Sequence, residues 1–254
     1  MKNNLTIVII SKNESEVIAN ALKSTQGFAD EVIVIDSLSI DNTVAIAEKF
    51  GAIVKKHAFK DFAEQRSIAL SYIKTKWVFY MDADEELTEG FKKEVEHILK
   101  NREENSTIGG YFINRKTYYY GHDWHMTDNV QRLFVTQNLI GWYGKVHETP
   151  KITGEFGHIL SPVLHFTHRN LSQMLQKTNE WSEYEAKLRF QVQHPKMEAW
   201  RFFRVMGSEF LRSYVKDKGY KNGTYGLIEA IYQAFSIFIT YAKLWEMQNK
   251  QAKK

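Results

Sequence analysis

Two aspartates separated by one alanine, Asp82 and Asp84, directly follow an apolar segment and could hold a metal ion. Residues 77–81 are aromatic or aliphatic, which predicts a buried strand with both carboxylates at its end. Hard divalent cations such as Mg²⁺ or Mn²⁺ bind carboxylate oxygens and keep open positions for substrate phosphates. The pair therefore predicts a metal site beside a phosphate, with Asp84 as the more direct ligand. Two exposed caps before the next helix are the alternative.

Polar residues also follow two other apolar segments, at points where further strands are expected to end. Ser11, Asn13 and Glu14 come after residues 5–10, and Asp36 comes after residues 31–35. Ligands of open α/β sheets bind beyond the carboxyl ends of the strands. We expect Asp36 to accept hydrogen bonds from a ribose hydroxyl or a base N–H. A cap for the turn that follows is the alternative role for this carboxylate.

Three further sites carry side chains suited to phosphoryl or glycosyl chemistry. Arg66 lies on the helix before the Asp82 strand and could bind a diphosphate bidentately, unless it is simply exposed. His147 and Glu148 follow a loop rich in Gly, Trp and Tyr, where Glu148 could act as a general base and His147 could contact substrate. A surface turn is the alternative for Glu148. His165 or His168 could complete the metal site or touch a phosphate, or be a hydrogen-bonded core histidine.

Several classes of site are excluded by what the sequence lacks. No G-x-G-x-x-G follows the first expected strand, which argues against a dinucleotide cofactor, and no P-loop motif is present. The chain contains no cysteine, so disulfides, thiolate metal sites and a cysteine nucleophile are excluded.

Strand and helix signals alternate over the first hundred residues, which indicates βαβ units and a mixed, mainly parallel α/β sheet. A polar turn at 121–129 is expected between two later strands, and helical periodicity dominates from Leu171 onward. We therefore expect an α/β domain over residues 1–168 and a helical region over 169–254 packed on it. The expected strands are 5–10, 31–35, 52–56, 76–81, 110–120 and 130–136, and the expected helices are 14–24, 41–50, 61–73 and 88–99.

Positive charge is concentrated toward the C-terminus. The net charge is +4, and residues 187–254 contain 13 Lys/Arg and 5 Asp/Glu, or +8, which leaves −4 for residues 1–186. Residues 230–242 are uncharged, but as a helix they would cover only about 20 Å, too short to span a bilayer. No signal peptide is recognisable. We expect a cytoplasmic protein whose basic, aromatic tail contacts an anionic membrane surface, the alternative being a helical face packed on the α/β domain.

The ordered motifs resemble family 2 glycosyltransferases, which have the Rossmann-like GT-A fold. The resemblance covers nearly the whole chain, and the later motifs look like a subgroup that adds a hexose, often glucose, to the lipopolysaccharide inner core. The matching segments are 6–14, 31–37 with 41–43, 62–67, 77–84, 131–134, 144–148 and 219–244.

The resemblance implies a UDP-sugar donor bound by the Ser11 loop and Asp36, a divalent metal on Asp84, and inverting displacement assisted by a carboxylate base. Many members have an acidic pair where this chain has His147-Glu148, and the Q-x-x-R-W signature of processive members is absent. We therefore expect transfer of one hexose, glucose favoured, to a lipid-linked or lipopolysaccharide-type glycan. A sugar-nucleotide pyrophosphorylase is an alternative, although it would open with a Gly-rich loop. A basic nucleic-acid-binding protein is another, motivated by the tail alone; we expect no nucleic-acid partner.

Overall fold

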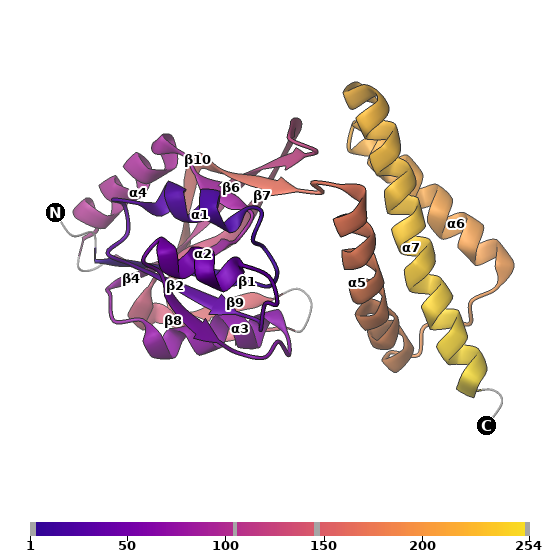
Figure 1. Ribbon diagram of the computed structural model, residues 1–254, viewed down its shortest axis with the longest axis horizontal. Helices are drawn as coiled ribbons and strands as arrows, with labels where there is room; N and C mark the ends of the chain where they lie inside the picture. Colours follow the sequence, from indigo (N-terminus) through magenta and orange to yellow (C-terminus); the bar gives the residue numbers. More distant parts are fainter. Residues whose placement is uncertain (1–3, 104–105, 145–147, 252–254) are drawn as a thin grey trace. The chain divides into compact units, whose positions relative to one another are not determined.

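The computed structural model describes residues 4–103, 106–144 and 148–251 (Figure 1). The chain divides into two compact units. Unit 1 comprises Met1–Thr117 and Thr127–Phe166, and unit 2 comprises Tyr118–Met126 and Thr167–Lys254. The fold class expected from the sequence, a mixed α/β sheet followed by a helical C-terminal region, is confirmed.

An eight-stranded sheet with the order β3-β2-β1-β4-β7-β6-β10-β5 forms the centre of unit 1. Strand β1 pairs in parallel with β2 and β4, and β2 pairs in parallel with β3, whereas β4–β7 and β10–β5 are antiparallel. A separate hairpin joins β8 and β9. The strands are β1 Leu5–Ser11, β2 Glu31–Asp36, β3 Ile53–Lys56, β4 Trp77–Asp82, β5 Glu85–Leu87, β6 Ile108–Tyr119, β7 His122–Val135, β8 Leu139–Tyr143, β9 Thr149–Ile152 and β10 Glu155–Thr167.

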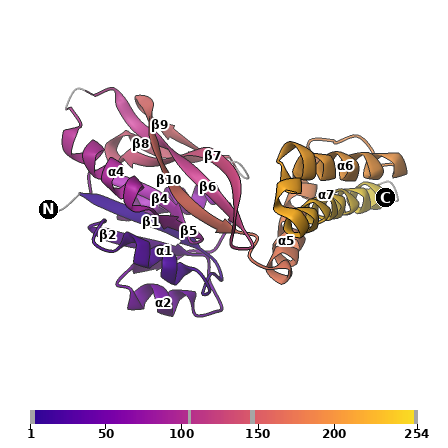
Figure 2. The same ribbon diagram turned by 90° about the horizontal axis from the view of Figure 1, so that it is seen from above.

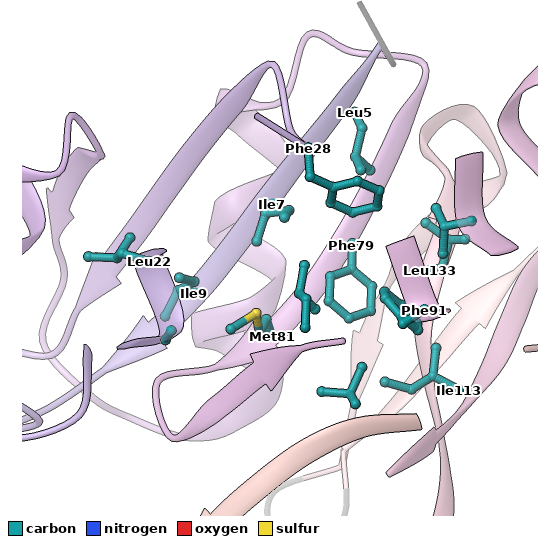
Figure 3. Packing of buried hydrophobic residues seen from close by; sticks show 14 of the residues in the cluster. Leu5, Ile7, Ile9, Leu22, Phe28, Phe79, Met81, Phe91, Ile113 and Leu133 are labelled. Atoms are coloured by element: carbon teal, nitrogen blue, oxygen red, sulfur yellow. The ribbon is translucent and has the colours of Figure 1, made fainter. Parts of the chain in front are cut away.

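Alternate side chains of the central strands enter two separate cores, because successive residues of a strand point to opposite faces. Ile7 and Phe79 pack in one core with side chains of α1 (Ile18–Thr25), α2 (Thr43–Lys49) and α4 (Glu89–Asn101). Figure 3 shows Leu22 of α1 and Phe91 of α4 in this core. Val8 and Tyr80 pack on the other face with α3 (Phe62–Ala69) and β8. Figure 2 shows α1 and α2 together on one side of the sheet. The central strands are thus covered on both faces of the sheet, and this packing holds the strand ends in fixed positions.

Two helices of unit 1 begin where the sequence places a side-chain cap. Asp61 accepts a hydrogen bond from the backbone N–H of Glu64, and Thr88 accepts one from that of Phe91. Such caps satisfy backbone donors that the first helical turn leaves unpaired. Helix α3 ends at Ala69, and a short 3₁₀ turn, Leu70–Tyr72, follows it.

Helices α1 and α2 begin later than predicted. Helix α1 begins at Ile18 rather than Glu14, and the backbone N–H groups of Glu14 and Ser15 donate instead to Thr43 and Asp41. These long-range hydrogen bonds hold residues 14–15 in turns, so local helical periodicity does not decide where α1 begins.

The predicted polar turn at 121–129 is wrong, because β7 already begins at His122. Its polar residues are mostly exposed, and pairing with neighbouring strands outweighs their weak intrinsic preference for a strand. Strand β5 was missed because three residues, two of them glutamates, give no period-2 signal.

Unit 2 contains three long helices that run side by side (Figure 1). They are α5 Leu171–Gln191, α6 Ala199–Leu211 and α7 Gly223–Gln251, and α7 contacts both of the others. A π-helical turn, Arg212–Lys216, and a 3₁₀ turn, Gly219–Asn222, connect α6 to α7. A Cβ placed on Gly226 would lie 1.8 Å from the Gly219 carbonyl oxygen, so this crossing requires glycine.

Helix α7 is longer than residues 230–242 suggested. Its 29 residues extend about 43 Å at the usual helical rise. Among the described residues, Gly219–Lys250 is the one helical segment long and apolar enough to cross a membrane by length and composition. Core helices of soluble proteins meet the same criterion, so this property alone does not distinguish a membrane span from a packed helix.

Candidate functional site

The ends of three parallel strands bring the predicted polar residues of unit 1 to one edge of the sheet. Ser11 is the register partner of Asp36 across β1 and β2, and Ile10 is the partner of Asp82 across β1 and β4. This edge is where ligands of parallel α/β sheets bind.

Asp36 is the centre of what we call the hydroxyl cluster, which comprises Ser11, Asp36 and Ser39. The Asp36 side chain is fully buried and accepts hydrogen bonds from the Ser11 hydroxyl (3.3 Å) and from the Ser39 backbone N–H (2.9 Å) and hydroxyl. Every partner of this carboxylate in these contacts is uncharged. It is therefore stabilised by neutral donors, which a ribose hydroxyl or a base N–H could join or replace.

Asn13 and Glu14 connect the loop after β1 to the loop after β2. Asn13 has a φ of 55°, its backbone N–H donates to the Ser39 hydroxyl (2.8 Å), and its side-chain oxygen accepts from the Ile40 N–H (2.9 Å). The Glu14 N–H donates to the Thr43 hydroxyl (2.8 Å). These hydrogen bonds fix the two loops against each other and so fix the surroundings of Asp36.

Asp82 lies in a dense group of ion pairs that we call the arginine cluster, formed by Arg66, Arg115, Arg132, Asp82, Glu85 and Glu148. One Asp82 oxygen contacts Arg66 Nη2 at 2.9 Å, and the other contacts Arg132 Nη2 at 3.0 Å and Arg115 Nη1 at 3.7 Å. The predicted base, Glu148, lies 3.0 Å from Arg66 Nε and 3.7 Å from Arg132 Nη1. The structure thus brings Arg66, Asp82 and Glu148 together, although they are far apart in the sequence.

Two of the carboxyl groups beside the arginines, those of Asp82 and Glu85, have pKa values shifted in opposite directions. Burial raises the pKa of Asp82, but the charges of Arg132, Arg66 and Arg115 outweigh it and hold that pKa well below its usual range. Glu85 is fully buried, and both burial and the nearby Asp82 charge raise its pKa. Its Oε2 accepts a hydrogen bond from the Asp82 backbone N–H (3.0 Å). Asp82 is therefore the ionised partner of the arginines.

Arg66 is buried beside two aromatic side chains, Trp142 and Tyr80. Its guanidinium carbon lies 5.2 Å from the centre of the Trp142 ring and 5.9 Å from that of Tyr80. The Tyr80 hydroxyl donates to the Arg66 carbonyl (2.9 Å). Among the described residues, buried Arg66 Nη1 and Arg132 Nε have no hydrogen-bond partner. Unused buried donors of this kind suit an anionic ligand.

Asp84 and His165 form a second, separate pair. His165 Nε2 lies 3.6 Å from Asp84 Oδ1, because β5 pairs with β10 and places Glu85 opposite His165. The Phe166 N–H also donates to the Asp84 carbonyl (2.8 Å). Burial lowers the pKa of His165, but its hydrogen bond to Asp84 and the charge of that carboxylate outweigh burial and raise it.

A two-residue donor set is typical of Mg²⁺ and Mn²⁺ sites that share their metal with substrate phosphates. No group of three or more His, Cys, Asp or Glu side chains that could hold a metal occurs within the part of the chain that the structure describes. The Asp84 carboxylate fits such a cation, and ligand phosphates would supply further oxygens, whereas the His165 imidazole could join only by releasing the proton that its raised pKa retains. His147 lies outside the described residues.

Three members of the arginine cluster were not predicted, namely Glu85, Arg115 and Arg132. Arg132 directly precedes three buried apolar residues of β7. An arginine next to a buried strand segment needs an ionic partner, so this position could have been predicted from the sequence. Arg115 contacts Glu85 at 3.2 Å and Asp128 at 2.6 Å, contacts that depend on strand pairing and leave no local sequence pattern.

Comparison with known proteins identifies a family. A model described as glycosyl transferase family 2 matches residues 6–170. An uncharacterized glycosyltransferase of Rickettsia conorii is 28% identical over 97% of this chain and 91% of its own length. The lipopolysaccharide core biosynthesis glycosyltransferase LpsC of Rhizobium meliloti is 27% identical over 98% of this chain and 94% of its own length.

Two solved structures are among those to which this chain is similar. Residues 1–349 of S. aureus TarS, in complex with UDP-GlcNAc, give a TM-score of 0.49 at 12% identity, covering 99% of this chain and 92% of the other. Glucosyl-3-phosphoglycerate synthase from Mycobacterium tuberculosis, in complex with Mn²⁺, UDP-glucose and phosphoglyceric acid, gives 0.37 at 23% identity, covering 45% and 43%. Both TM-scores are below 0.5, so nothing follows from them about this chain's chemistry.

Proposed function

Since the chain belongs to glycosyl transferase family 2, we propose that it transfers a single hexose, with glucose favoured, from a UDP-sugar to a glycan acceptor of the cell envelope. The observation that carries this proposal is the arginine cluster beside the Asp82–Asp84 strand end. Three guanidinium groups at the end of a parallel strand suit the two phosphates of a sugar nucleotide. The 27% identity to the lipopolysaccharide core enzyme LpsC supports an acceptor of the lipopolysaccharide type.

The hydroxyl cluster is the proposed site of the nucleoside. Asp36 would accept a hydrogen bond from a ribose hydroxyl or a uracil N–H, with Ser11, Asn13 and Glu14 forming the wall of this site. These residues and the arginine cluster lie at neighbouring strand ends. One nucleotide-sugar could therefore reach both.

A divalent metal would be held by Asp84 and His165. Asp82 is less available as a ligand, because both of its oxygens contact guanidinium groups. The metal would supply positive charge against the diphosphate leaving group. The arginines would bind the same diphosphate from the protein side, so the chain's own residues share the task of stabilising the negative charge that develops on it.

Glu148 is the proposed general base for an inverting displacement. In that step the acceptor oxygen bonds to the anomeric carbon, the bond from that carbon to the diphosphate breaks, and the acceptor hydroxyl loses its proton to a carboxylate. The contact between Glu148 Oε1 and Arg66 Nε would orient the side chain, and Oε2 would take the acceptor proton. His147 would contact the acceptor or donor next to this base.

The helical unit is proposed to hold the protein on the cytoplasmic face of an anionic membrane. Trp200 and Phe203 on α6 are 53% and 78% exposed. The guanidinium groups of Arg201 and Arg204 lie 4.8 and 5.6 Å from the Trp200 ring. Exposed aromatic rings beside cations are how helices lie in the interface of an anionic bilayer. Wild-type protein should sediment with anionic liposomes at low salt, and changing Arg201, Arg204 and Arg212 to Glu should abolish this. Wild-type protein remaining in the supernatant would refute membrane attachment.

The central test is binding followed by turnover. UDP, UDP-glucose and UDP-GlcNAc are each added with Mn²⁺, Mg²⁺ or chelator, and thermal unfolding is measured. A ligand present at 100 times its Kd should stabilise the folded state by about 2.7 kcal/mol. UDP-glucose with metal should give the largest shift, and UDP release should require a glycan acceptor. Formation of UDP-glucose from UTP and glucose 1-phosphate would instead identify a pyrophosphorylase. Salt-sensitive DNA binding without sugar-nucleotide binding would favour a nucleic-acid-binding protein.

A further inference from the structure

A pocket lies wholly within unit 2, in the groove between α5 and α7. It encloses about 230 Å³ and is lined by residues 167–169, five positions of α5 and two of α7. Sites for drug-sized ligands enclose about 300–1,000 Å³, so this pocket has room for roughly one sugar ring and not for a nucleotide.

One wall of the pocket combines cationic and aromatic side chains. Lys177 and Trp181 lie four positions apart on α5 and therefore share a face of that helix. Arg169 lies just before the helix, which begins at Leu171, so the positive end of the helix dipole faces the same region. An aromatic ring beside cations suits a sugar that carries negative charge, because the ring covers its apolar face and the cations bind its anionic group.

The other wall is held by hydroxyl groups. The Thr178 hydroxyl lies 2.7 Å from the Tyr232 hydroxyl and 3.4 Å from the Ser236 hydroxyl, joining α5 to α7 across the pocket. Tyr232 also donates to the Met174 carbonyl (3.0 Å). Hydroxyl groups both donate and accept hydrogen bonds, which suits the several hydroxyls of a sugar ring.

His168 is fixed at the edge of the pocket by an arrangement that local structure does not require. Its φ is 47°, in the left-handed region, and its Nδ1 lies 2.8 Å from Oε1 of Glu229, which is only 1% exposed. The ring also stacks on Tyr119, with centroids 4.6 Å apart. A strained backbone and a buried carboxylate persist where the surroundings over-determine them, and such positions cluster at ligand sites.

We propose that this pocket, which we call the helical pocket, binds an anionic sugar of the acceptor through Arg169, Lys177, Trp181 and an oriented His168. The class of ligand is a pyranose carrying a phosphate ester or a carboxylate. That the bound sugar belongs to the acceptor rests on the proposed glycosyl transfer. That the pocket binds an anionic sugar does not depend on it. His168 contacts the sugar, and Glu229 is a positioning residue that fixes its ring.

The experiment titrates the full-length protein, without donor, with glucose 6-phosphate, glucuronate, methyl glucoside and inorganic phosphate, and measures each Kd by calorimetry. At least one anionic sugar should bind about tenfold tighter than methyl glucoside, as expected for one charged hydrogen bond. The first two probes distinguish a phosphate ester from a carboxylate. Tighter binding of inorganic phosphate than of both anionic sugars would overturn the proposal, because it would show a site for the ion alone.

Variants place the effect in the pocket. Lys177→Gln should weaken binding of the anionic sugar about tenfold and leave methyl glucoside unchanged. Lys187→Gln is the matched control, since Lys187 is an exposed lysine of the same helix that pairs with Glu183 (3.2 Å) outside the pocket. Both substitutions are at exposed positions, so folding should be retained. Equal Kd values for Lys177→Gln and wild type would overturn the proposal.

A second pair of measurements separates this proposal from the proposed function. Glu229→Gln should weaken binding of the anionic sugar about tenfold while leaving UDP binding unchanged, and the loss should be absent for inorganic phosphate. If UDP-sugars do not bind but the anionic sugar does, glycosyl transfer fails and the helical pocket stands. If UDP-sugars bind and turn over but no anionic sugar binds at the helical pocket, the pocket proposal fails alone.

Discussion

The hydroxyl cluster and the arginine cluster lie at neighbouring strand ends but are built from opposite chemistry. In the hydroxyl cluster, a fully buried Asp36 is stabilised by serine hydroxyls and a backbone N–H. In the arginine cluster, Asp82 is stabilised by three guanidinium groups. Both solve the same problem, a carboxylate removed from water, which costs several kcal/mol unless it is paired or hydrogen-bonded.

The difference indicates which part of a ligand each cluster suits. Neutral donors discriminate by geometry and tolerate a neutral ligand in their place, as a nucleoside requires. Guanidinium groups hold multiple negative charges, as a diphosphate requires. If this comparison is right, changes in the arginine cluster and its adjoining metal pair should reduce turnover strongly, whereas changes in the hydroxyl cluster should act mainly on donor affinity.

The largest effect is expected at Asp84. Asp84→Ala should lower kcat on the order of 10³-fold or more, because it removes the carboxylate oxygen proposed to hold the metal. The measurement is UDP release in buffer with defined Mn²⁺, with Glu89→Gln, an exposed helix carboxylate, as the control. Wild-type turnover of Asp84→Ala in chelator-treated buffer would remove the metal from the proposal.

Glu148 should give the next largest effect. Glu148→Gln should lower kcat about 10²- to 10⁴-fold, the usual contribution of a general base, while UDP binding stays nearly unchanged. The comparison of kcat with the UDP dissociation constant checks this. A loss below about threefold would move the search for the base to other carboxylates, with Asp123 and Asp128 tested first.

Arg132 tests whether the arginine cluster is structural as well as functional. Arg132→Gln leaves Asp82, whose side chain is 28% exposed, with fewer cations, so the free energy of unfolding should fall by about 2 kcal/mol, less than for a fully buried pair. Urea denaturation measures this, and UDP affinity should fall in parallel. The double variant with Asp82→Asn should recover part of the stability, because the unpaired charge is gone. Additive losses in the double variant would show that the two side chains do not act as a pair.

Asp36 should give a smaller effect with a different signature. Asp36→Ala should raise the donor KM about tenfold, the value of one or two lost hydrogen bonds, and leave the acceptor KM unchanged. Initial rates measured against each substrate in turn separate the two constants. Equal changes in both would exclude Asp36 from nucleotide recognition and break the comparison between the two clusters.

The smallest effect concerns pH and the loop that supports the hydroxyl cluster. Burial raises the pKa of Asp41, but its hydrogen bonds from Thr43 and Ser15 outweigh burial and lower it from 3.8 to about 2. Because the folded-state pKa is the lower one, Asp41 stabilises the fold above about pH 4, and this is lost as pH falls toward 2. Asp41→Asn should therefore reduce the acid sensitivity of unfolding by roughly 0.5 kcal/mol, since the carboxylate is exposed and screened. Urea midpoints at pH 6 and pH 3 measure this, and identical pH dependence would contradict it.

The sequence was most informative where one strand and its end carry the signal. Apolar runs predicted β1, β2 and β4, and the polar residues at their ends fall where expected, because a parallel strand buried on both faces reads as a continuous apolar segment. The expected helix starts at residues 61 and 88 coincide with the observed caps Asp61 and Thr88, since a cap depends only on its own next few residues.

The sequence was least informative where strand pairing decides the neighbours. Arg115 and Glu85 meet because β6, β10 and β5 lie in order at one side of the sheet, and no local pattern encodes that order. His168 and Glu229 are separated by 61 residues, so their contact was also invisible to local reading. The role of a single residue could be proposed from its type and its position in the sequence. The ion pairs and hydrogen bonds that set its charge or orientation could be recognised only in the folded structure.

The pairing of β5 with β10 also sets the order in which the molecule can assemble. Asp84 lies beside β5, and its partner His165 lies on β10, about eighty residues later in the chain. His165 is also the last of these site residues in chain order, after every member of the arginine cluster, so it emerges last during synthesis. During synthesis, a nascent chain that has emerged only as far as β9 has all three parallel strand ends but lacks His165. Such a chain would contain the sites proposed for nucleotide and diphosphate before it contains the complete metal pair.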